Sequence, residues 1–496
     1  MIGPQSNRNL SVSAVSKLAV VRRLAVLACL LGALVGAPCA LGAGTLFIRG
    51  GGYGHGIGMS QYGALGYALH GKDYRYILGH YYTGTQLAQT DPMQVVRVLL
   101  RTGSASFSGA TQAAGAGAKP VVKPLHAGST YAVRALANGS LVLLDPAGKK
   151  LGTFAAPLTV TGPTPLALAG MGAYRGSLEF RPDGSGGVQT VDALALDDYV
   201  RGVIGLEMSA SWPAQALEAQ AVAARTYAIT TSVSGNGYTL YPDTRSQMYG
   251  GVSAESAATD AAVAATRGQI VTYGGAPAVT YFFSSSGGYT ENIENVWIGA
   301  TPEPWLRGVP DPYDGAGGNP YHRWAYNLTP GTAAHDLGGL LKGSLVGIRI
   351  TKHGVSPRIL LAQVVGTKGT TSVTGGQLQS AFRLLTTYAS FTLVTTSPGL
   401  PSPHSARDVM RRGMAPSAAV FRLMATLSRA ARAVHGSVFP GHRGQVVAVQ
   451  QLVHGAWQTV AQPRLAANGA YATRVRAAGQ YRVVVSGLNG PAVTVG

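Results

Sequence analysis

Residues 199–231, YVRGVIGLEMSASWPAQALEAQAVAARTYAITT, decide the fold of this chain. The stretch opens with an apolar, partly β-branched run at 199–206, which predicts a strand that is buried on at least one face. A helix is predicted to start near Pro213, because proline is tolerated in a first turn and Ser211 can cap the helix. The stretch therefore predicts a strand-to-helix joint with a single acid, Glu207, at the joint.

Glu207 is the first candidate for acid/base chemistry. A helix start favours the ionised carboxylate through the macrodipole, whereas burial against Met208 and Trp212 favours the neutral acid. Spacing alone leaves two interpretations open. Glu207 is either an ordinary acid at a helix N-terminus or a catalytic group.

Length and composition indicate a large, β-rich protein. The chain has 496 residues, which predicts two or three domains. Its 68 glycines indicate many turns and close backbone approaches, and 46% hydrophobic residues can supply a sizeable core. The charged share of 12% is low for a cytosolic enzyme.

The first 43 residues have the pattern of a signal peptide. Basic residues precede an apolar run at 24–35, and small residues follow it. The run is too short to span a membrane comfortably, so membrane contact is expected only through an uncleaved leader. The two cysteines, Cys29 and Cys39, both lie in this segment. Cleavage would therefore leave an exported, secreted or wall-associated chain without disulfide or thiol chemistry.

A strongly basic charge points to anionic partners. The formal net charge is +19, or about +15 without the leader. Outside the membrane these partners are anionic cell-wall polymers or lipid head groups. Nucleic acid is the less favoured alternative, because neither an aromatic RNA-binding signature nor a Lys/Arg-rich arm is present.

The glycine-rich loop at 50–58, GGGYGHGIG, invites comparison with a phosphate-binding loop. No Gly-Lys-Ser/Thr follows it and no βαβ unit surrounds it, so we reject that interpretation. The glycines are expected to let backbone approach a ligand or a neighbouring strand closely. His55 can then donate to a sugar or a carboxylate, or it is a turn histidine without a role. His55, His70 and His80 lack the spacing of a zinc helix, which predicts no metal here.

The remaining segments predict an α+β chain that is rich in β-structure and has a few helices. Residues 93–173 predict a β-rich insert, and two polar, glycine-bearing loops at 238–251 and 284–292 suit carbohydrate hydroxyls. The second loop has no Gly-x-Ser-x-Gly elbow, which argues against a serine nucleophile. Residues 396–433 predict a basic linker. Short, evenly spaced strands at 434–496 predict a small C-terminal β-sandwich.

Several separate motifs lie along the chain. They are LDDYVRGV at 196–203, Glu207-Met208, AQAVAARTY at 219–227, SQMYGG at 246–251, SSGGYTE at 285–291 and GHGIGMSQYGA at 54–64. Together these motifs resemble the SpoIID/LytB family of cell-wall proteins, and the resemblance covers roughly residues 45–395. The C-terminal segment is similar, on weaker grounds, to an Ig-like or fibronectin-like module.

The resemblance implies a domain at 44–395, with a glycine-histidine segment (44–92), the β-rich insert and a catalytic core at 174–395. In the sporulation members the glycine-histidine motif usually follows the Glu-bearing helix. In this chain the motif precedes that helix, which resembles the order in actinobacterial members. The reversal implies that the glycine loop folds back beside Glu207, which is possible if the chain ends of the core lie close together.

The family's sporulation members are lytic transglycosylases that act on peptide-free glycan strands, and their catalytic acid corresponds to Glu207. Some members bind zinc through a cysteine in the Ser-x-Cys-Gly-Gly motif. Because Ser286 stands in that place, no zinc and no other cofactor is expected. Candidates to line the sugar groove are His55, Gln61, Tyr62, Gln220, Arg225, Gln247, Tyr249 and Ser286. Each can instead have a structural role.

Three functions follow from these observations. The first is an exported transglycosylase that cleaves MurNAc-β-1,4-GlcNAc bonds and leaves 1,6-anhydroMurNAc ends. The second is a non-enzymatic wall-binding factor that enhances a partner amidase, as other family members do. The third is a basic wall adhesin that acts through its C-terminal module.

Overall fold

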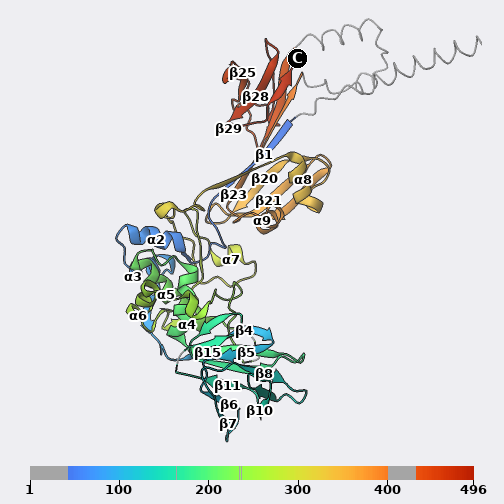
Figure 1. Ribbon diagram of the computed structural model, residues 1–496. Coiled ribbons are helices and arrows are strands. Elements are labelled where there is room, and N and C mark those ends of the chain that lie inside the picture. The colour runs from blue at the N-terminus through green and yellow to red at the C-terminus, as the bar shows by residue number, and fades with distance from the viewer. Residues whose placement is uncertain (1–42, 164, 234, 236, 400–431) are drawn as a thin grey trace, which may run out of the picture. The chain divides into compact units, whose positions relative to one another are not determined.

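The computed structural model describes residues 43–163, 165–233, 235, 237–399 and 432–496 (Figure 1). The predicted signal peptide up to residue 42 and the linker segment 400–431 lie outside the described residues. About 20% of the chain is helix and 38% is strand, which confirms the predicted β-rich α+β class. No helix in the described part of the chain combines the length and hydropathy of a membrane span.

The chain divides into two compact units. The larger unit is Ile48–Phe391, and among the described residues the smaller one joins 43–47 to 392–399 and 432–496. The division falls inside two strands, β1 (Ala43–Gly50) and β23 (Ala389–Pro398). The larger unit lies within the predicted family domain at 44–395.

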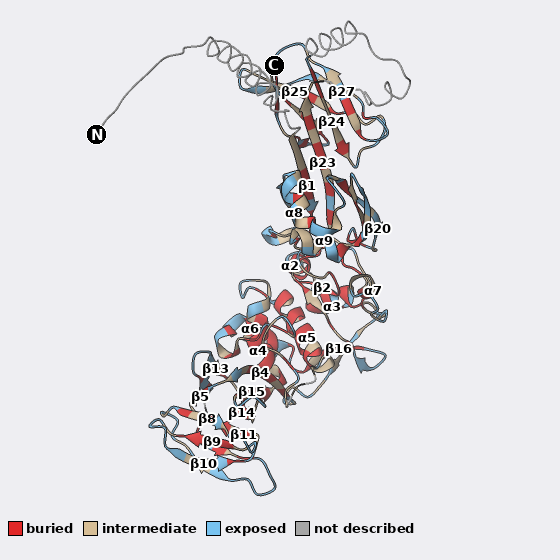
Figure 2. Ribbon diagram, turned by 90° about the vertical axis from the view of Figure 1, so that its right-hand side faces the viewer, coloured by how far each residue is buried: buried red, intermediate tan, exposed pale blue. Residues whose placement is uncertain are grey.

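A group of helices forms the centre of the larger unit. Its longest member is α5, which packs against α2, α3, α4 and α6 and is buried along most of its length (Figure 2). Alanines on α5 permit this close packing on several sides. The helices are α2 (Gln61–Leu69), α3 (Tyr74–Tyr81), α4 (Leu196–Glu207), α5 (Ala214–Thr230) and α6 (Ala257–Ala265).

The predicted strand at 199–206 is wrong. These residues belong to α4, whose apolar face is formed by Leu196, Tyr199, Val200, Val203 and Ile204. These residues recur with the i, i+3, i+4, i+7, i+8 spacing of an amphipathic helix.

The predicted cap of the following helix is wrong as well. The N-cap position of α5 is Pro213, and no side chain caps that end of the helix. Ser211 instead has its hydroxyl 2.9 Å from that of Ser209. Glu207 consequently lies at the last residue of α4 rather than at a helix start.

Two six-stranded sheets form the β-rich part of the larger unit. They pack on one another through Phe107 and Phe180, whose rings stack at 5.3 Å. The second sheet includes strands from both sides of residue 173, so it crosses the predicted boundary between insert and core. The first sheet has the order β10 (Lys150–Phe154), β9 (Leu141–Leu144), β8 (Tyr131–Ala135), β5 (Ala105–Ser108), β12 (Leu166–Leu168), β13 (Gly172–Tyr174). The second has the order β4 (Val95–Gly103), β15 (Val188–Ala195), β14 (Ser177–Pro182), β11 (Leu158–Thr161), β6 (Gln112–Ala114), β7 (Val122–Pro124).

Smaller elements complete the larger unit. A parallel pair of two-residue strands joins the glycine loop to a distant segment, with Met59 opposite Phe282. The sheets are β3 (Gln86–Gln89), β16 (Gln269–Tyr273) and β17 (Ala276–Pro277); β2 (Met59–Ser60) and β18 (Phe282–Phe283); and β20 (Leu345–His353), β21 (Ile359–Gly366) and β22 (Gly369–Thr374). The remaining elements are η1 (Gly251–Ala254), α7 (Ile293–Val296), η2 (Ala316–Gly318), β19 (Trp324–Leu328), α8 (Pro330–Leu337), η3 (Gly338–Leu340) and α9 (Gly375–Phe382).

The smaller unit has its own apolar core, which includes Val434, Tyr471 and Tyr481. Residues 393–398 of β23 pair with β24, and β24 pairs with β27. A second sheet has the order β26-β25-β28-β29, with β30 on β28. Its similarity to an Ig-like sandwich stays a prediction. The strands are β24 (Ala433–Phe439), β25 (Ala448–Val453), β26 (Ala456–Ala461), β27 (Ala470–Arg474), β28 (Gly479–Val485), β29 (Leu488–Asn489) and β30 (Val493–Val495).

Candidate active site

Glu207 faces a groove in the larger unit. The groove has a cavity volume of about 520 Å³ and joins the end of α4 to the glycine loop and to the SQM turn at 246–248. The fold thus brings residue 55 and residue 207 to one place, as the motif order implied. The lining residues are Tyr53, Gly54, His55, Gln61, Glu207, Tyr227, Thr244, Arg245, Ser246, Gln247, Met248, Tyr281, Phe282, Phe283, Ser284 and Trp297.

Two donors hold the half-buried carboxyl group of Glu207. Gln61 donates from Nε2 to Oε2 at 3.1 Å, and the Met248 backbone N–H donates to Oε1 at 3.3 Å. Burial raises the pKa of Glu207 above its usual value, and the two hydrogen bonds oppose this rise. The carboxyl is therefore fixed in orientation and more easily protonated than an exposed glutamate.

Hydrogen bonds join the glycine loop and the residue after it, Met59, to residues 281–285. Tyr53 and Ser285 exchange two backbone hydrogen bonds of 2.8 and 3.0 Å, and Met59 N–H donates to Tyr281 O at 3.1 Å. Gly58 has a φ of +73°, and a Cβ there would collide with the Tyr281 carbonyl. The glycines therefore serve close approach to a neighbouring strand, one of the two alternatives expected from the sequence.

His55 is held as a neutral imidazole by backbone on both sides. Its Nδ1 accepts from the Ile57 N–H at 3.0 Å, so its Nε2 carries the proton and donates to Phe282 O at 3.0 Å. Burial and the nearby Arg358 charge lower the pKa of His55 to about 4. Both ring nitrogens are thus used inside the protein, and His55 presents only its ring to the groove.

An aromatic row lies beside the carboxyl. Tyr62 follows Gln61 directly, and its ring lies 5.1 Å from Trp212 and 6.1 Å from Tyr321. Tyr321 in turn lies 4.9 Å from the exposed Tyr53 ring. Partly exposed aromatic faces in a row are suited to pyranose rings. Tyr62 was expected to line the groove, but neither it nor Tyr321 is among the lining residues, whereas Tyr53, which was not expected, does line it.

Arg225 and Gln220 are fully buried within α5. Arg225 donates from Nε to Asp197 at 2.6 Å and from Nη1 to the Gln269 carbonyl at 3.1 Å. It joins the first turn of α4 to α5 and β16, which is the structural alternative left open for this residue. Neither side chain lines the groove.

Gln247 and Tyr249 flank the Met248 donor and point into the protein. Gln247 lines the groove but donates its amide to the Ala224 carbonyl at 3.1 Å. Tyr249 is buried and donates to Asp192 at 2.6 Å. These contacts hold the turn so that the Met248 N–H reaches Glu207.

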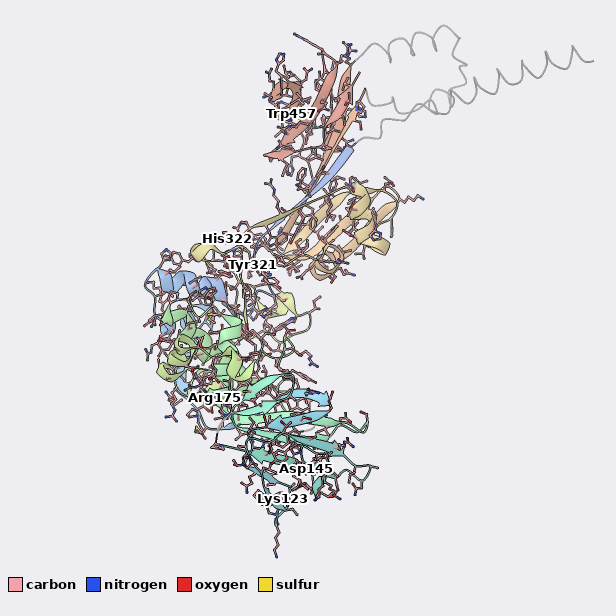
Figure 3. All side chains as sticks on the ribbon, in the orientation of Figure 1. Lys123, Asp145, Arg175, Tyr321, His322 and Trp457 are labelled. Atoms are coloured by element: carbon pink, nitrogen blue, oxygen red, sulfur yellow. The ribbon has the colours of Figure 1, made fainter. Side chains whose placement is uncertain are left out.

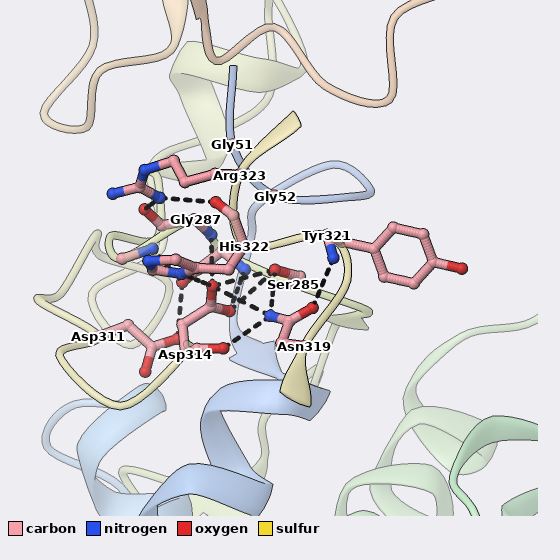
Figure 4. A network of polar contacts seen from close by, with 12 residues as sticks. Gly51, Gly52, Ser285, Gly287, Asp311, Asp314, Asn319, Tyr321, His322 and Arg323 are labelled. Carbon is pink, nitrogen blue, oxygen red and sulfur yellow. Dashed lines mark hydrogen bonds and ion pairs between the residues drawn. The ribbon is translucent and has the colours of Figure 1, made fainter. Parts of the chain in front are cut away.

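Ser286 belongs to a buried polar network next to the groove. Asp311, Asp314 and His322 of this network are labelled in Figure 4. Its hydroxyl donates to Asp311 at 2.7 Å, and its N–H donates to Asp314 at 2.8 Å. Asp314 also accepts from Ser285 and contacts His322 at 2.8 Å. The network ties the SSSGG loop to the loop that carries Tyr321, whose ring points away from it in Figure 4.

The sequence did not predict several other side chains that line the groove, among them Tyr227, Arg245 and Trp297. Tyr227 lies in the last turn of α5, in a motif that was recognised, but its distance of 20 positions from Glu207 gave no sign of proximity. Arg245 stacks on Tyr241 at 3.7 Å and pairs with Asp243 at 2.7 Å. Trp297 follows α7 and packs 5.5 Å from His55.

The described residues contain no cluster of three or more histidine, cysteine or acidic side chains arranged to hold a metal. Asp311 and Asp314 belong to one network, in which both oxygens of Asp314 and Oδ2 of Asp311 accept from hydroxyl and backbone N–H donors. Only Oδ1 of Asp311 has no hydrogen-bond partner among the described residues.

Fold and site together define a β-rich α+β protein with one carboxylic acid in an aromatic-lined groove. Residues 184–273, which carry Glu207, match the SpoIID family, described as Stage II sporulation protein. With the relatives below, this match supports placement of the chain in the SpoIID/LytB family.

Relatives with curated names are similar over part of the chain. Stage II sporulation protein D of Bacillus subtilis (strain 168) is 35% identical over 196 residues, which is 36% of this chain and 56% of that protein. The amidase enhancer of the same organism is 45% identical over 103 residues, 21% of this chain and 14% of that protein. Stage II sporulation protein D of Bacillus amyloliquefaciens is 36% identical over 142 residues, 25% of this chain and 41% of that protein.

The chain thus spans about half, or less, of the length of the curated relatives it matches. No solved structure matches it. The similarities suggest a function related to the cell wall.

Proposed function

We propose that this protein is an exported peptidoglycan lytic transglycosylase whose catalytic acid is Glu207. One observation carries the proposal: among the described residues that line the groove, Glu207 is the only acid. An ordinary glycosidase needs two carboxyl groups, because one of them acts as nucleophile or activates water. A lytic transglycosylase needs only one, because the nucleophile is a hydroxyl of the substrate.

The mechanism uses both protonation states of Glu207. The protonated acid donates to the oxygen that links MurNAc C1 to GlcNAc, and the C1–O bond breaks through an oxocarbenium-like transition state. The MurNAc 6-hydroxyl then attacks C1, and the Glu207 carboxylate takes its proton. The product is a 1,6-anhydro ring, no water is consumed, and the acid returns to its starting state.

The surroundings of Glu207 are suited to both steps. Burial favours the protonated acid, and the Gln61 and Met248 donors stabilise the carboxylate that forms after the first transfer. The row of Trp212, Tyr62 and Tyr321 supplies faces on which sugar rings can stack.

The test is purified protein on peptide-free glycan strands, with anhydro-sugar ends scored by mass spectrometry. Glu207→Gln should lower the rate about 10²–10⁴-fold, because it removes the general acid while keeping the side-chain shape. Thermal unfolding of the variant should match that of the parent. Folded parent protein that gives no anhydro ends over a range of pH and metal conditions would contradict the proposal.

A second candidate function is favoured by the similarity to the amidase enhancer. In this alternative the groove binds glycan without cleaving it and recruits or stimulates a partner amidase. Glu207→Gln would then leave wall binding and amidase stimulation unchanged. Both alternatives place the protein outside the membrane with peptidoglycan and anionic wall polymers as partners.

A further inference from the structure

A second groove adjoins the first within the larger unit. Its cavity volume is about 880 Å³, and it shares Tyr53, Gly54, His55 and Trp297 with the groove of Glu207. The shared residues form a common wall between the two. The other side of the second groove comes from β21, the start of α9 and the segment 383–387.

This second groove is basic. Lys352 and Arg383 line it with exposed side chains, and neither forms an ion pair in the described structure. Its one acid, Glu294, is already paired with Arg307 at 2.7 Å. The N-terminal turn of α9, at 374–376, also lines the groove and favours negative charge there.

A buried arginine also lines the second groove. Arg358 is 2% exposed, and its guanidinium donates only from Nη1, to the Gly54 carbonyl at 3.1 Å. Its Nε and Nη2 have no hydrogen-bond partner among the described residues. The nearby carboxylate of Glu291 is already bonded to Asn295, Val355 and Ser356. An anion in the groove would therefore lie next to a positive charge that no direct ion pair neutralises.

The groove also has a surface for sugars. Trp297 and Tyr53 are 38% and 43% exposed, and Ile298 beside them is 85% exposed. Exposed aromatic rings next to unpaired cations are suited to a ligand that alternates sugar faces with negative charges. A peptide-free glycan strand has this chemistry, because every second sugar carries a lactyl carboxylate.

We propose that the second groove binds the continuation of the glycan strand and that Lys352 and Arg383 recognise its lactyl carboxylates. The proposal rests on the proposed function for its substrate class. It adds a reason for selectivity: strands whose carboxylates are free fit the basic groove, whereas strands whose carboxylates are bonded to stem peptides do not present the same charge.

The test measures binding in a Glu207→Gln background, so that cleavage plays no part in it. The ligands are peptide-free glycan strands and the same strands with their carboxyl groups reduced to alcohols, titrated by calorimetry at low salt. The unsubstituted groove should prefer the acidic strands. K352Q with R383Q should weaken their binding roughly 3- to 10-fold and leave binding of the reduced strands unchanged.

The matched control is K123Q with K150Q, on the β-sheets at the opposite end of the larger unit from Tyr321 and His322, as the position of Lys123 in Figure 3 shows. It changes the net charge equally and should weaken binding less than K352Q with R383Q does, because its charges lie far from the second groove. Thermal unfolding checks that both double variants are folded.

Three outcomes would overturn the proposal: equal affinity of the parent groove for both strands, an equal loss in the control, or stronger competition by poly(glycerol phosphate) than by glycan. The last result would reassign the groove to a teichoic-type polymer. Failure of the transglycosylase proposal would appear separately, as the absence of anhydro ends with the parent protein.

Discussion

At the scale of single residues, the decisive feature is the pair of donors on Glu207. The carboxyl group is predictable from the sequence motif, but its partners are not. Gln61 lies 146 positions away, and Met248 contributes a backbone N–H that no side-chain pattern reveals. The sequence therefore predicts the acid and its neighbourhood but not the groups that adjust its pKa.

This geometry predicts how Gln61 affects the pH dependence of the proposed reaction. Its hydrogen bond stabilises the carboxylate, so Gln61→Met should raise the pKa of Glu207 further. Activity needs protonated Glu207. The basic limb of the pH–rate profile should therefore move to higher pH in the variant. Rates of anhydro-end formation across pH measure this shift. Gln112→Met is the control, because Gln112 is exposed on β6 and does not line the groove of Glu207. A limb that stays in place, or moves to lower pH, would contradict the role of Gln61.

A second residue-scale prediction concerns the stability of the core beneath the site. Burial raises the pKa of Asp192 to about 8 from its ordinary value of 3.8, against the opposing hydrogen bond from Tyr249. The folded state then holds a proton that the unfolded chain loses near pH 4. The contribution of Asp192 to the free energy of unfolding is fully present below about pH 4 and is lost as pH rises through 8. The loss is no more than about 1.4 kcal/mol per pH unit.

Asp192→Asn should flatten this dependence, because the amide keeps an acceptor for Tyr249 and cannot ionise. Urea denaturation at several pH values between 5 and 9 measures the free energy of unfolding. Parallel pH dependence in the parent and the variant would rule out Asp192 as the source.

At the scale of elements, α4 shows why part of the fold was mispredicted. Val200, Val203 and Ile204 suggest a strand by residue type, but they recur at helical spacing with Leu196 and Tyr199. Tertiary burial on α5 and α6 outweighs their weak strand preference. The correction also moves Glu207 from a helix start to a helix end, so the macrodipole there does not favour its ionised form.

Two glycines permit a prediction about helix packing. Gly205 in α4 leaves no room for a Cβ against the Ala254 carbonyl, whereas Gly79 in α3 has nothing within 4 Å. Gly205→Ala should lower the free energy of unfolding by about 1–3 kcal/mol through overpacking. Gly79→Ala should raise it by up to about 1 kcal/mol through helix propensity. Chemical denaturation compares the free energy of unfolding of both variants with that of the parent. An equal increase in the two variants would contradict the prediction, because it would mean that η1 moves away to make room for the new methyl group.

At the scale of the whole molecule, a mixed α+β class and a family resemblance could be predicted from composition and motifs. The topology could not, because strands such as β4 and β15 pair across more than 80 residues of chain. The second groove could not be predicted either. Its cations, Lys352 and Arg383, lie in no motif and meet Trp297 only after the chain has folded.

Net charge carries the last prediction. A formal charge of +19, or about +15 without the predicted leader, should attract the protein to an anionic wall over distances comparable to the Debye length. That length falls from about 10 Å at 0.1 M salt to about 3 Å at 1 M. The fraction bound to purified sacculi should therefore fall steeply over this range of salt. Stacking of sugars on Tyr62, Trp212 and Tyr321 carries no net charge, so binding of short, carboxyl-reduced glycan should change little. A pull-down with both ligands across the salt series measures the difference. If binding to sacculi depended on salt as little as binding to the neutral glycan does, retention would be assigned to the aromatic row rather than to the charge of the chain.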